Sequence, residues 1–224
     1  MSKAQFDKFA ADYDKILSDS LHTDGADLAY YSSYKVALMR RLAPPGVSRI
    51  LDFGCGIGKT IGHLKQAFPA ATVDGCDVSP DALEVARAAN PGANFFMPAS
   101  SEAMQGAYDL AFLANVLHHI QPAGRGDWFK ALRRMLKPGG SIFFFEHNPL
   151  NPVVRHIVRT CPLDEDAVLV HPCELRRLSE KAGCRVATWG YTLFFGAGLR
   201  RLSFLEPWLR WLPLGAQYYM QVIC

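Results

Sequence analysis

An apolar run that ends in an aspartate and opens into three alternating glycines constrains the fold of this chain most strongly. Ile50, Leu51 and Asp52 lead into residues 53–58, Phe-Gly-Cys-Gly-Ile-Gly, and a helix is predicted from about 59 to 68. Glycines let the backbone adopt positive φ angles and pass close to a ligand. The free N–H groups at the N-terminus of the following helix can bind an anion. The pattern therefore predicts a buried strand, a ligand-binding turn and a helix.

The same alternation continues along the chain. We predict strands at 71–77, 94–97, 109–115, 141–146, 184–191 and 217–223, and helices at 5–17, 30–42, 80–90, 128–136 and 172–182. The segment Lys137-Pro138-Gly139-Gly140 is expected to stop the helix before it. Strands alternating with helices predict an α/β fold, a doubly wound, seven-stranded, mostly parallel, Rossmann-like sheet. We expect one domain over residues 1–224, with N-terminal helices in 1–46 and the ligand at the carboxyl ends of the strands.

Three kinds of ligand compete for the glycine loop. A dinucleotide loop would need glycine at 59, where Lys59 stands, and a phosphate-binding P-loop would need glycine at Phe53. The amino-acid carboxylate of S-adenosylmethionine (SAM) is a third anion that the helix N-terminus could bind. Asp52 would then be a partner for the ammonium group of SAM. A tight turn without a ligand stays open as an alternative.

Asp77 ends the second predicted strand, 25 residues after Asp52. A carboxylate at that position suits two hydrogen bonds from ribose hydroxyl groups, a feature that NAD and SAM share. Asp74 and the turn at Ser79-Pro80 make this evidence weak when it stands alone. Together with the glycine loop, it indicates an adenosine-containing cofactor.

At this point the sequence resembles the class I SAM-dependent methyltransferases, closest to the group that acts on small molecules. The resemblance runs from about Phe6 to Gly190 and implies a last strand that is antiparallel. It rests on the glycine loop and on five further stretches: Phe6-Asp7-x-x-Ala10-x-x-Tyr13-Asp14, Gly75-Cys76-Asp77-Val78-Ser79-Pro80, Tyr108-Asp109-Leu110, Val116-Leu117-His118-His119 and Leu136-Lys137-Pro138-Gly139-Gly140.

The resemblance implies a set of residues that bind the cofactor. The methionine part is assigned to the loop, the ribose to Asp77 with Val78, and the reactive end to Asn115. The family often has an acidic residue after the third strand that contacts adenine, but this sequence has Ala99 or Ser100 there, so we predict Ser100. The full predicted set is Tyr13, Asp52, Gly54, Cys55, Gly56, Gly58, Asp77, Val78, Ser100 and Asn115.

Candidates for proton removal follow the fourth and fifth strands. Methyl transfer is an in-line displacement at an activated sulfonium, so the protein mainly aligns the reactants. An oxygen or nitrogen acceptor can also need its proton removed, which histidine suits near neutral pH. We predict His118, His119 and Glu146 as catalytic residues, with His147 beside them. The alternative is that the imidazoles only bind backbone near the strand ends.

Residues 192–215, between the last two strands, form a predicted cap over the acceptor. From Leu199 to Leu212 apolar residues recur at helical spacing, with Trp208 and Trp211 among them, although Pro207 must start or kink a helix there. Three interpretations stay open: packing on the domain or on a partner of an oligomer, a lid over an apolar acceptor, or a patch in peripheral contact with a membrane.

Charge and composition exclude other classes of function. A net charge of +3, spread along the chain, predicts no nucleic-acid partner. The longest uncharged stretches, such as residues 186–199, are too short for a transmembrane segment, and no signal peptide is recognised. We therefore expect a cytoplasmic protein with free, mostly buried cysteines. We predict no metal site, because the spacing of His156, Cys161, His171 and Cys173 matches no familiar ligand pattern.

These observations predict an enzyme that transfers the methyl group of SAM to a small-molecule or lipid-like acceptor. One alternative is an NAD-dependent oxidoreductase, and another is a SAM-binding scaffold without activity. The identity of the acceptor and the atom that is methylated lie beyond the sequence.

Overall fold

The computed structural model describes residues 16, 18–19, 25–98 and 104–224. One seven-stranded sheet runs through it in the order β3-β2-β1-β4-β5-β7-β6. Strand β7 is antiparallel to β5 and β6, and the other neighbouring pairs are parallel. The predicted fold, including the antiparallel last strand, is confirmed. The strands are β1 (Arg49–Phe53), β2 (Thr72–Cys76), β3 (Phe95–Phe96), β4 (Tyr108–Ala114), β5 (Leu136–His147), β6 (Arg185–Thr192) and β7 (Gln217–Ile223).

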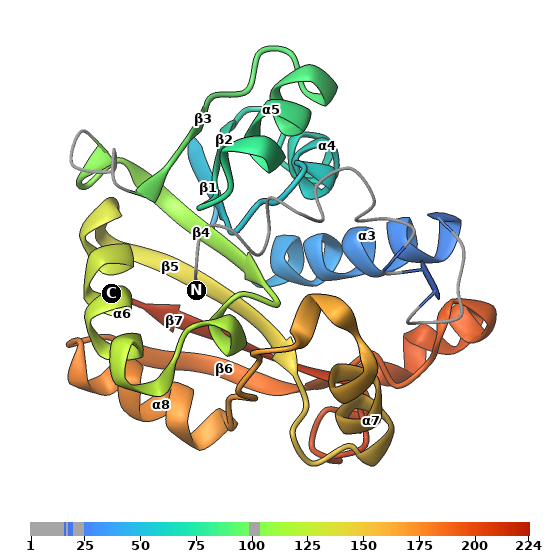
Figure 1. Cartoon of the computed structure of the whole chain (residues 1–224). Helices are drawn as coiled ribbons and strands as arrows, with labels where there is room; N and C mark the ends of the chain where they lie inside the picture. The colour runs from blue at the N-terminus through green and yellow to red at the C-terminus, as the bar shows by residue number, and fades with distance from the viewer. Residues whose placement is uncertain (1–15, 17, 20–24, 99–103) are drawn as a thin grey trace.

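Helices cover both faces of this sheet (Figure 1). Alternate residues of a strand point to opposite faces, so Leu51 and Phe53 enter one hydrophobic core while Ile50 enters the other. The first core contains side chains of α6 (Arg125–Met135) and α8 (Pro172–Lys181). The second contains side chains of α3 (Gly25–Leu42), α4 (Lys59–Ala67) and α5 (Pro80–Ala89). The two cores fix the sheet between its helices and leave the strand ends available for a site.

The segment Lys137-Pro138-Gly139-Gly140 follows the end of a helix, as predicted, but it already belongs to a strand. Helix α6 ends at Met135, and Leu136 is already extended and pairs with Tyr108. Regular pairing resumes between Leu110 and Ser141, so the four residues form a bulge within β5. The physical reason is that the Lys137 ammonium reaches Asp109 Oδ1 at 2.6 Å and so holds the bulge against β4.

The chain between β5 and α8 contains elements that the sequence reasoning did not predict. Helix α7 (Pro152–Thr160) begins after Asn151, whose side chain accepts hydrogen bonds from Val153 N and Val154 N. A short 3₁₀-helix, η4 (Pro162–Asp164), follows. Two other 3₁₀ turns, η2 (Leu117–His119) and η3 (Pro122–Gly124), lie between β4 and α6. These turns and α7 place side chains beside the strand ends.

The region 192–215 is helical, but not as one α-helix. Residues Ala197–Leu205 form a 3₁₀-helix, η5, and Glu206–Leu209 form the single turn α9, with Pro207 in that first turn. Recurrence at three and four residues does not distinguish the two helix types, and Pro207 prevents one continuous α-helix. Figure 1 places this red segment beside α3.

The expectation that all cysteines are free is wrong for one pair. Cys184 and Cys224 form a disulfide. The register of the sheet explains this pair, because Arg185 lies opposite Ile223 and the two cysteines are the next residues outward. Cys55, Cys76 and Cys161 are free and buried, and Cys173 is free and exposed. No helix within the described residues is long and apolar enough to cross a membrane.

Candidate functional site

A cavity of about 670 Å³ lies at the carboxyl ends of the strands. Its floor comes from the glycine loop and from Ala114 and Asn115 at the end of β4. Its other walls come from α3, from α7 and from residues 193–196 after β6. The predicted residues Asp52, Gly54, Cys55, Gly56 and Asn115 all line this cavity. Tyr13 and Ser100 lie outside the described residues.

The three loop glycines have different reasons for being glycine. All three have positive φ angles, between 50° and 79°. A side chain at Gly54 would clash with Val116, and one at Gly58 would approach the Asn90 amide to 2.7 Å. A Cβ at Gly56 would meet no described protein atom within 4 Å, although Gly56 lines the cavity. Gly54 and Gly58 therefore allow the loop to pack, and Gly56 leaves room for a ligand.

Asp52 at the end of β1 is the cavity's buried carboxyl group. Its side chain is 2% exposed, and its Oδ2 has no hydrogen-bond partner among the described residues. Burial, and then the nearby Asp77, raise the pKa of Asp52 to about 8. A buried polar atom without a partner is unfavourable. A cationic or hydrogen-bond-donating ligand at this position would satisfy Oδ2 and favour the ionised form.

Asp77, just after β2, contacts the backbone of the glycine loop. Its Oδ2 accepts a hydrogen bond from Gly56 N at 2.8 Å, and its Oδ1 accepts one from Ser79 N at 3.0 Å. Asp77 and its half-buried neighbour Val78 are not among the residues that line the cavity. A ribose assignment for Asp77 therefore stays a prediction. The contact with Gly56 ties the position of this carboxylate to the conformation of the loop.

Asn115 follows β4 in a left-handed conformation, with φ 59°. Its backbone N–H donates to Phe145 O, and its Oδ1 accepts from Gln217 Nε2 at 2.8 Å. Asparagine tolerates this backbone region better than most residues do. The two hydrogen bonds fix the side chain at the cavity wall, between the ends of β4, β5 and β7.

Lys35 is a buried cation to which the sequence analysis assigned no role in the site. It belongs to α3, lines the cavity, and is only 7% exposed. No described residue forms a hydrogen bond or ion pair with its ammonium group. Burial lowers the pKa of Lys35 to about 8, although the charge of Glu146 opposes the shift. The cavity therefore contains a positive charge that lacks a direct counter-ion.

His118 and Glu146, two of the predicted catalytic residues, form a buried pair behind the cavity wall. His118 Nδ1 lies 2.7 Å from Glu146 Oε2, and Glu146 Oε1 accepts hydrogen bonds from Val116 N and Leu117 N. Burial alone would raise the pKa of Glu146, but His118 and the backbone donors lower it. Neither residue lines the cavity, and neither does His119. The imidazoles that do line it are those of His63 in α4 and of His147, the last residue of β5.

The wall formed by residues 193–196 is held by another buried carboxylate, Glu206. It accepts hydrogen bonds from Thr192 Oγ1, Leu193 N and Phe194 N, and also from the Tyr34 hydroxyl of α3. Leu193 itself has a left-handed backbone, with φ 58°. Phe194 and Phe195 line the cavity, so this segment supplies an apolar wall.

The glycine loop, Asp52, Asp77 and Asn115 all lie in the part of the chain that is similar to known proteins. A methyltransferase-domain family model matches residues 50–140. A ubiquinone/menaquinone biosynthesis C-methyltransferase from Syntrophotalea carbinolica is 32% identical over 162 residues, which cover 69% of this chain and 65% of that protein. The matched segment is that of a methyltransferase domain, and the fold is that of the class I SAM-dependent methyltransferases.

Other methyltransferases match over shorter or more distant ranges. A trans-aconitate 2-methyltransferase from Acidovorax sp. strain JS42 is 35% identical over 106 residues, which cover 47% of this chain and 40% of that protein. The chain thus spans less than two thirds of the length of these curated relatives. The crystal structure of a SAM-dependent methyltransferase from Archaeoglobus fulgidus has the same fold, with a TM-score of 0.68 and 16% identity over 95% of this chain and all of that one.

The similarity to SAM-dependent methyltransferases supports the predicted cofactor, SAM. The glycine loop and Asp52 fit it, because the loop leaves space at Gly56 and Asp52 has an unsatisfied buried oxygen. The sequence reasoning missed Lys35 and Glu206. Lys35 could have been found as a lysine on the buried face of its helix, next to Val36 and four residues before Met39. Glu206 has no comparable signal in the sequence.

Proposed function

We propose that this methyltransferase transfers the methyl group of SAM to a small-molecule acceptor bound in the same cavity. The observation that carries the proposal is the Asp52 carboxyl group, which is buried at the glycine loop and has an oxygen without a partner among the described residues. SAM supplies an activated methyl group and carries an ammonium group that would complete the hydrogen bonding of Asp52. This match supports SAM over a phosphate-containing ligand, which offers no cation.

Each part of the cavity would then have its own task. The glycine loop and Asp52 would hold the amino-acid part of the cofactor, and Asp77, which contacts the loop from outside the cavity, would bind the ribose hydroxyl groups. Asn115 lies at the end of β4, where the reactive end of the cofactor would lie. Because the displacement needs only alignment of acceptor and methyl group, these fixed contacts account for most of the chemistry.

The acceptor would combine an anionic group with an apolar part. Lys35 supports the anionic group, since a buried charge is unfavourable until a counter-ion or hydrogen bonds accompany it. Phe194, Phe195 and Val153 support the apolar part, because they line the cavity away from the glycine loop. Trans-aconitate, for which one relative is named, is a small anion and would match the Lys35 side of the cavity.

His118, His119 and Glu146 would affect the acceptor from behind the wall rather than by contact. His147 lines the cavity next to this group, and the rings of His118 and His147 lie 5.0 Å apart. Burial, and then the charge of His118, lower the pKa of His147 to about 3, so it is neutral at physiological pH. We therefore expect His118, His119 and Glu146 to affect the proton of the acceptor only through His147.

Calorimetric titration with SAM and with NAD tests the cofactor part of this proposal. We expect SAM to bind and NAD not to bind, and we expect Asp52→Asn to weaken SAM binding about tenfold or more, because it removes a charged acceptor. Equal binding of NAD would favour the oxidoreductase alternative. Release of S-adenosylhomocysteine with any acceptor from a panel of small carboxylates excludes a scaffold without activity.

The Lys35 assignment is tested with Lys35→Gln and with pH. We expect the variant to bind SAM normally but to need about ten times more acceptor for half-maximal rate, which corresponds to roughly 1.4 kcal/mol. In the wild type, acceptor affinity should be constant below pH 7 and fall above about pH 8, because Lys35 loses its charge there. A loss of SAM affinity instead would mean that Lys35 binds the carboxylate of the cofactor.

A further inference from the structure

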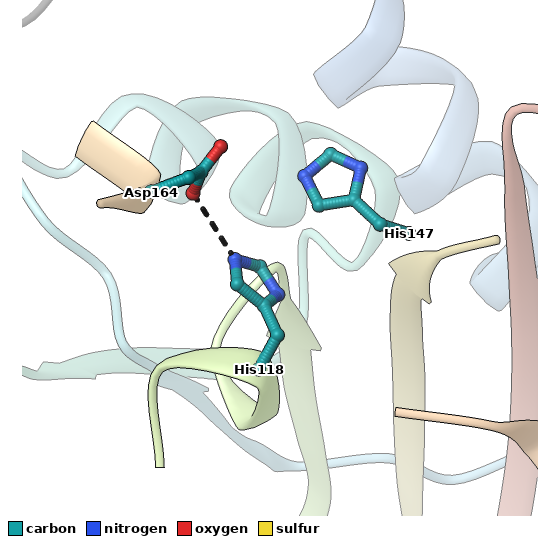
Figure 2. Close-up of side chains that lie close together, drawn as sticks. All are labelled: His118, His147 and Asp164. Carbon is teal, nitrogen blue, oxygen red and sulfur yellow. Dashed lines mark ion pairs between the residues drawn. The ribbon is translucent and has the colours of Figure 1, made fainter. Parts of the chain in front are cut away.

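We propose that His118, His147 and Asp164 bind a divalent first-row transition-metal ion at the edge of the cavity. The three side chains come from η2, from the end of β5 and from η4, and Figure 2 shows them pointing toward one another. One ligand atom from each lies within 4.8 Å of the other two. Three segments that are far apart in the sequence thus bring two imidazoles and a carboxylate to one point.

The orientation of His118 is the second observation. Glu146 Oε2 lies 2.7 Å from His118 Nδ1, so that nitrogen carries the proton and the lone pair is on Nε2. His118 is 1% exposed, and Nε2 has no hydrogen-bond partner among the described residues. Metal-binding histidines usually donate their other N–H to a carboxylate or a carbonyl in this way. Glu146 is held in turn by two backbone N–H groups.

The distances fit a metal better than a direct hydrogen bond. His118 Nε2 lies 3.4 Å from Asp164 Oδ1, and His119 Nε2 lies 3.5 Å from the same oxygen. A direct N–H···O hydrogen bond is about 2.9 Å long. Two ligands of a tetrahedral ion with bonds of about 2.1 Å are separated by about 3.4 Å. The spacing therefore leaves room for an ion between the atoms, with His119 next to the site.

Two carboxylates flank the His118 ring, Glu146 at Nδ1 and Asp164 at Nε2. The competing explanation is a metal-free network in which His118 is protonated between Glu146 and Asp164, whose charges hold its pKa at about 9 against the effect of burial.

Two imidazoles and one carboxylate suit ions such as Zn²⁺, Fe²⁺ or Co²⁺ and leave coordination positions open. Since His147 also lines the cavity, an open position on this side would be within reach of an acceptor. A bound metal lowers the pKa of an oxygen ligand. This role rests on the proposed function, whereas metal binding itself does not.

Metal binding is measured on the full chain without acceptor. The protein is stripped with a chelator, dialysed against Co²⁺, and examined for metal content and for the visible absorbance of Co²⁺ bound to nitrogen ligands. We expect about one ion per chain, at least a tenfold lower affinity in Asp164→Asn and in His147→Gln, and no change in His156→Ala. His156 is an exposed histidine of α7 and serves as the matched control.

Circular dichroism and thermal melts identify any variant that fails to fold. Asp164→Asn and His147→Gln alter different segments of the chain, so one of them that folds is enough to test the site. No Co²⁺ bound by the wild type, or equal binding in the folded variants and in the control, would overturn the proposal in favour of the metal-free network. Unchanged SAM affinity with and without metal is expected, which separates this result from a failure of the cofactor assignment.

Discussion

The two sides of the cavity are built in different ways. The cofactor side consists of a glycine loop between β1 and α4 and of strand ends that follow it closely in the sequence. The acceptor side combines α3, α7 and residues 193–196, which are separated by more than a hundred residues in places. The methyltransferase-domain family model matches residues 50–140, which contain the first side. Local sequence motifs therefore form the cofactor side, whereas packing between distant segments determines which side chains contact the acceptor.

The largest effect should come from the cofactor side, at Gly56. We expect Gly56→Val to abolish measurable SAM binding, by more than about a hundredfold, which is roughly 3 kcal/mol. The new side chain would occupy space that is open in the structure, and a φ of 50° costs a residue with a Cβ about 1–2 kcal/mol. Calorimetry measures the affinity, and Gly62→Ala in α4, where a Cβ also meets no atom, is the control.

If Gly56→Val binds SAM with nearly wild-type affinity, the loop is only a turn between strand and helix. The contrast between the two sides of the cavity would then fail, because neither would hold a ligand through a local motif.

Asp77 should give the next largest effect. We expect Asp77→Ala to weaken SAM binding roughly ten- to a hundredfold, because a charged hydrogen-bond acceptor contributes about 1.5–3 kcal/mol. The loss also includes the hydrogen bond to Gly56 N, so Asp77→Asn, which keeps one acceptor oxygen, should lose less. Asp81→Ala, at an exposed position of α5, is the control. Unchanged calorimetric affinity in a folded Asp77→Ala protein would end the ribose assignment.

The smallest effect should lie on the acceptor side. Trp208 and Trp211 are 69% and 73% exposed, so replacing both by alanine should leave the melting temperature and SAM affinity unchanged. If they cover a bound acceptor, turnover should fall about two- to tenfold, as expected for lost aromatic contacts. Steady-state kinetics with a responsive acceptor measures the change.

The same double variant distinguishes the three interpretations of residues 192–215. Wild-type turnover together with lost flotation on liposomes would mean a membrane patch, and a change in oligomeric state would mean a subunit contact. Either result would show that this segment serves something other than the acceptor.

The sequence was sufficient wherever one local pattern determines one structure. The glycine loop, the strand ends at Asp52 and Asn115, and the order of strands and helices follow from short motifs and hydrophobic periodicity. The bulge at Lys137-Pro138-Gly139-Gly140 was missed because Pro and Gly also end helices, and its cause is a contact with Asp109 in another strand.

Features that depend on contacts between distant segments could not be predicted in the same way. The disulfide between Cys184 and Cys224 depends on the register of β6 and β7, which the sequence does not reveal. The cluster of His118, His147 and Asp164 forms only after β4, β5 and η4 come together. Lys35 was visible in the sequence as a lysine on an apolar helix face, but its place in the cavity was not.

The backbone conformation of Leu193 affects how fast ligands can leave the cavity, because Leu193 belongs to the wall formed by residues 193–196. Its left-handed backbone costs about 1–2 kcal/mol, and the hydrogen bonds from Leu193 N to Glu206 and from Ala216 N to Leu193 O hold it in place. When these bonds break, the strain is released. Conformations in which residues 193–196 have moved away from the cavity are therefore about 5 to 30 times more populated than they would be without strain. The strain therefore lowers the free energy needed to open this wall, and a lower cost of opening shortens the time that a product stays bound.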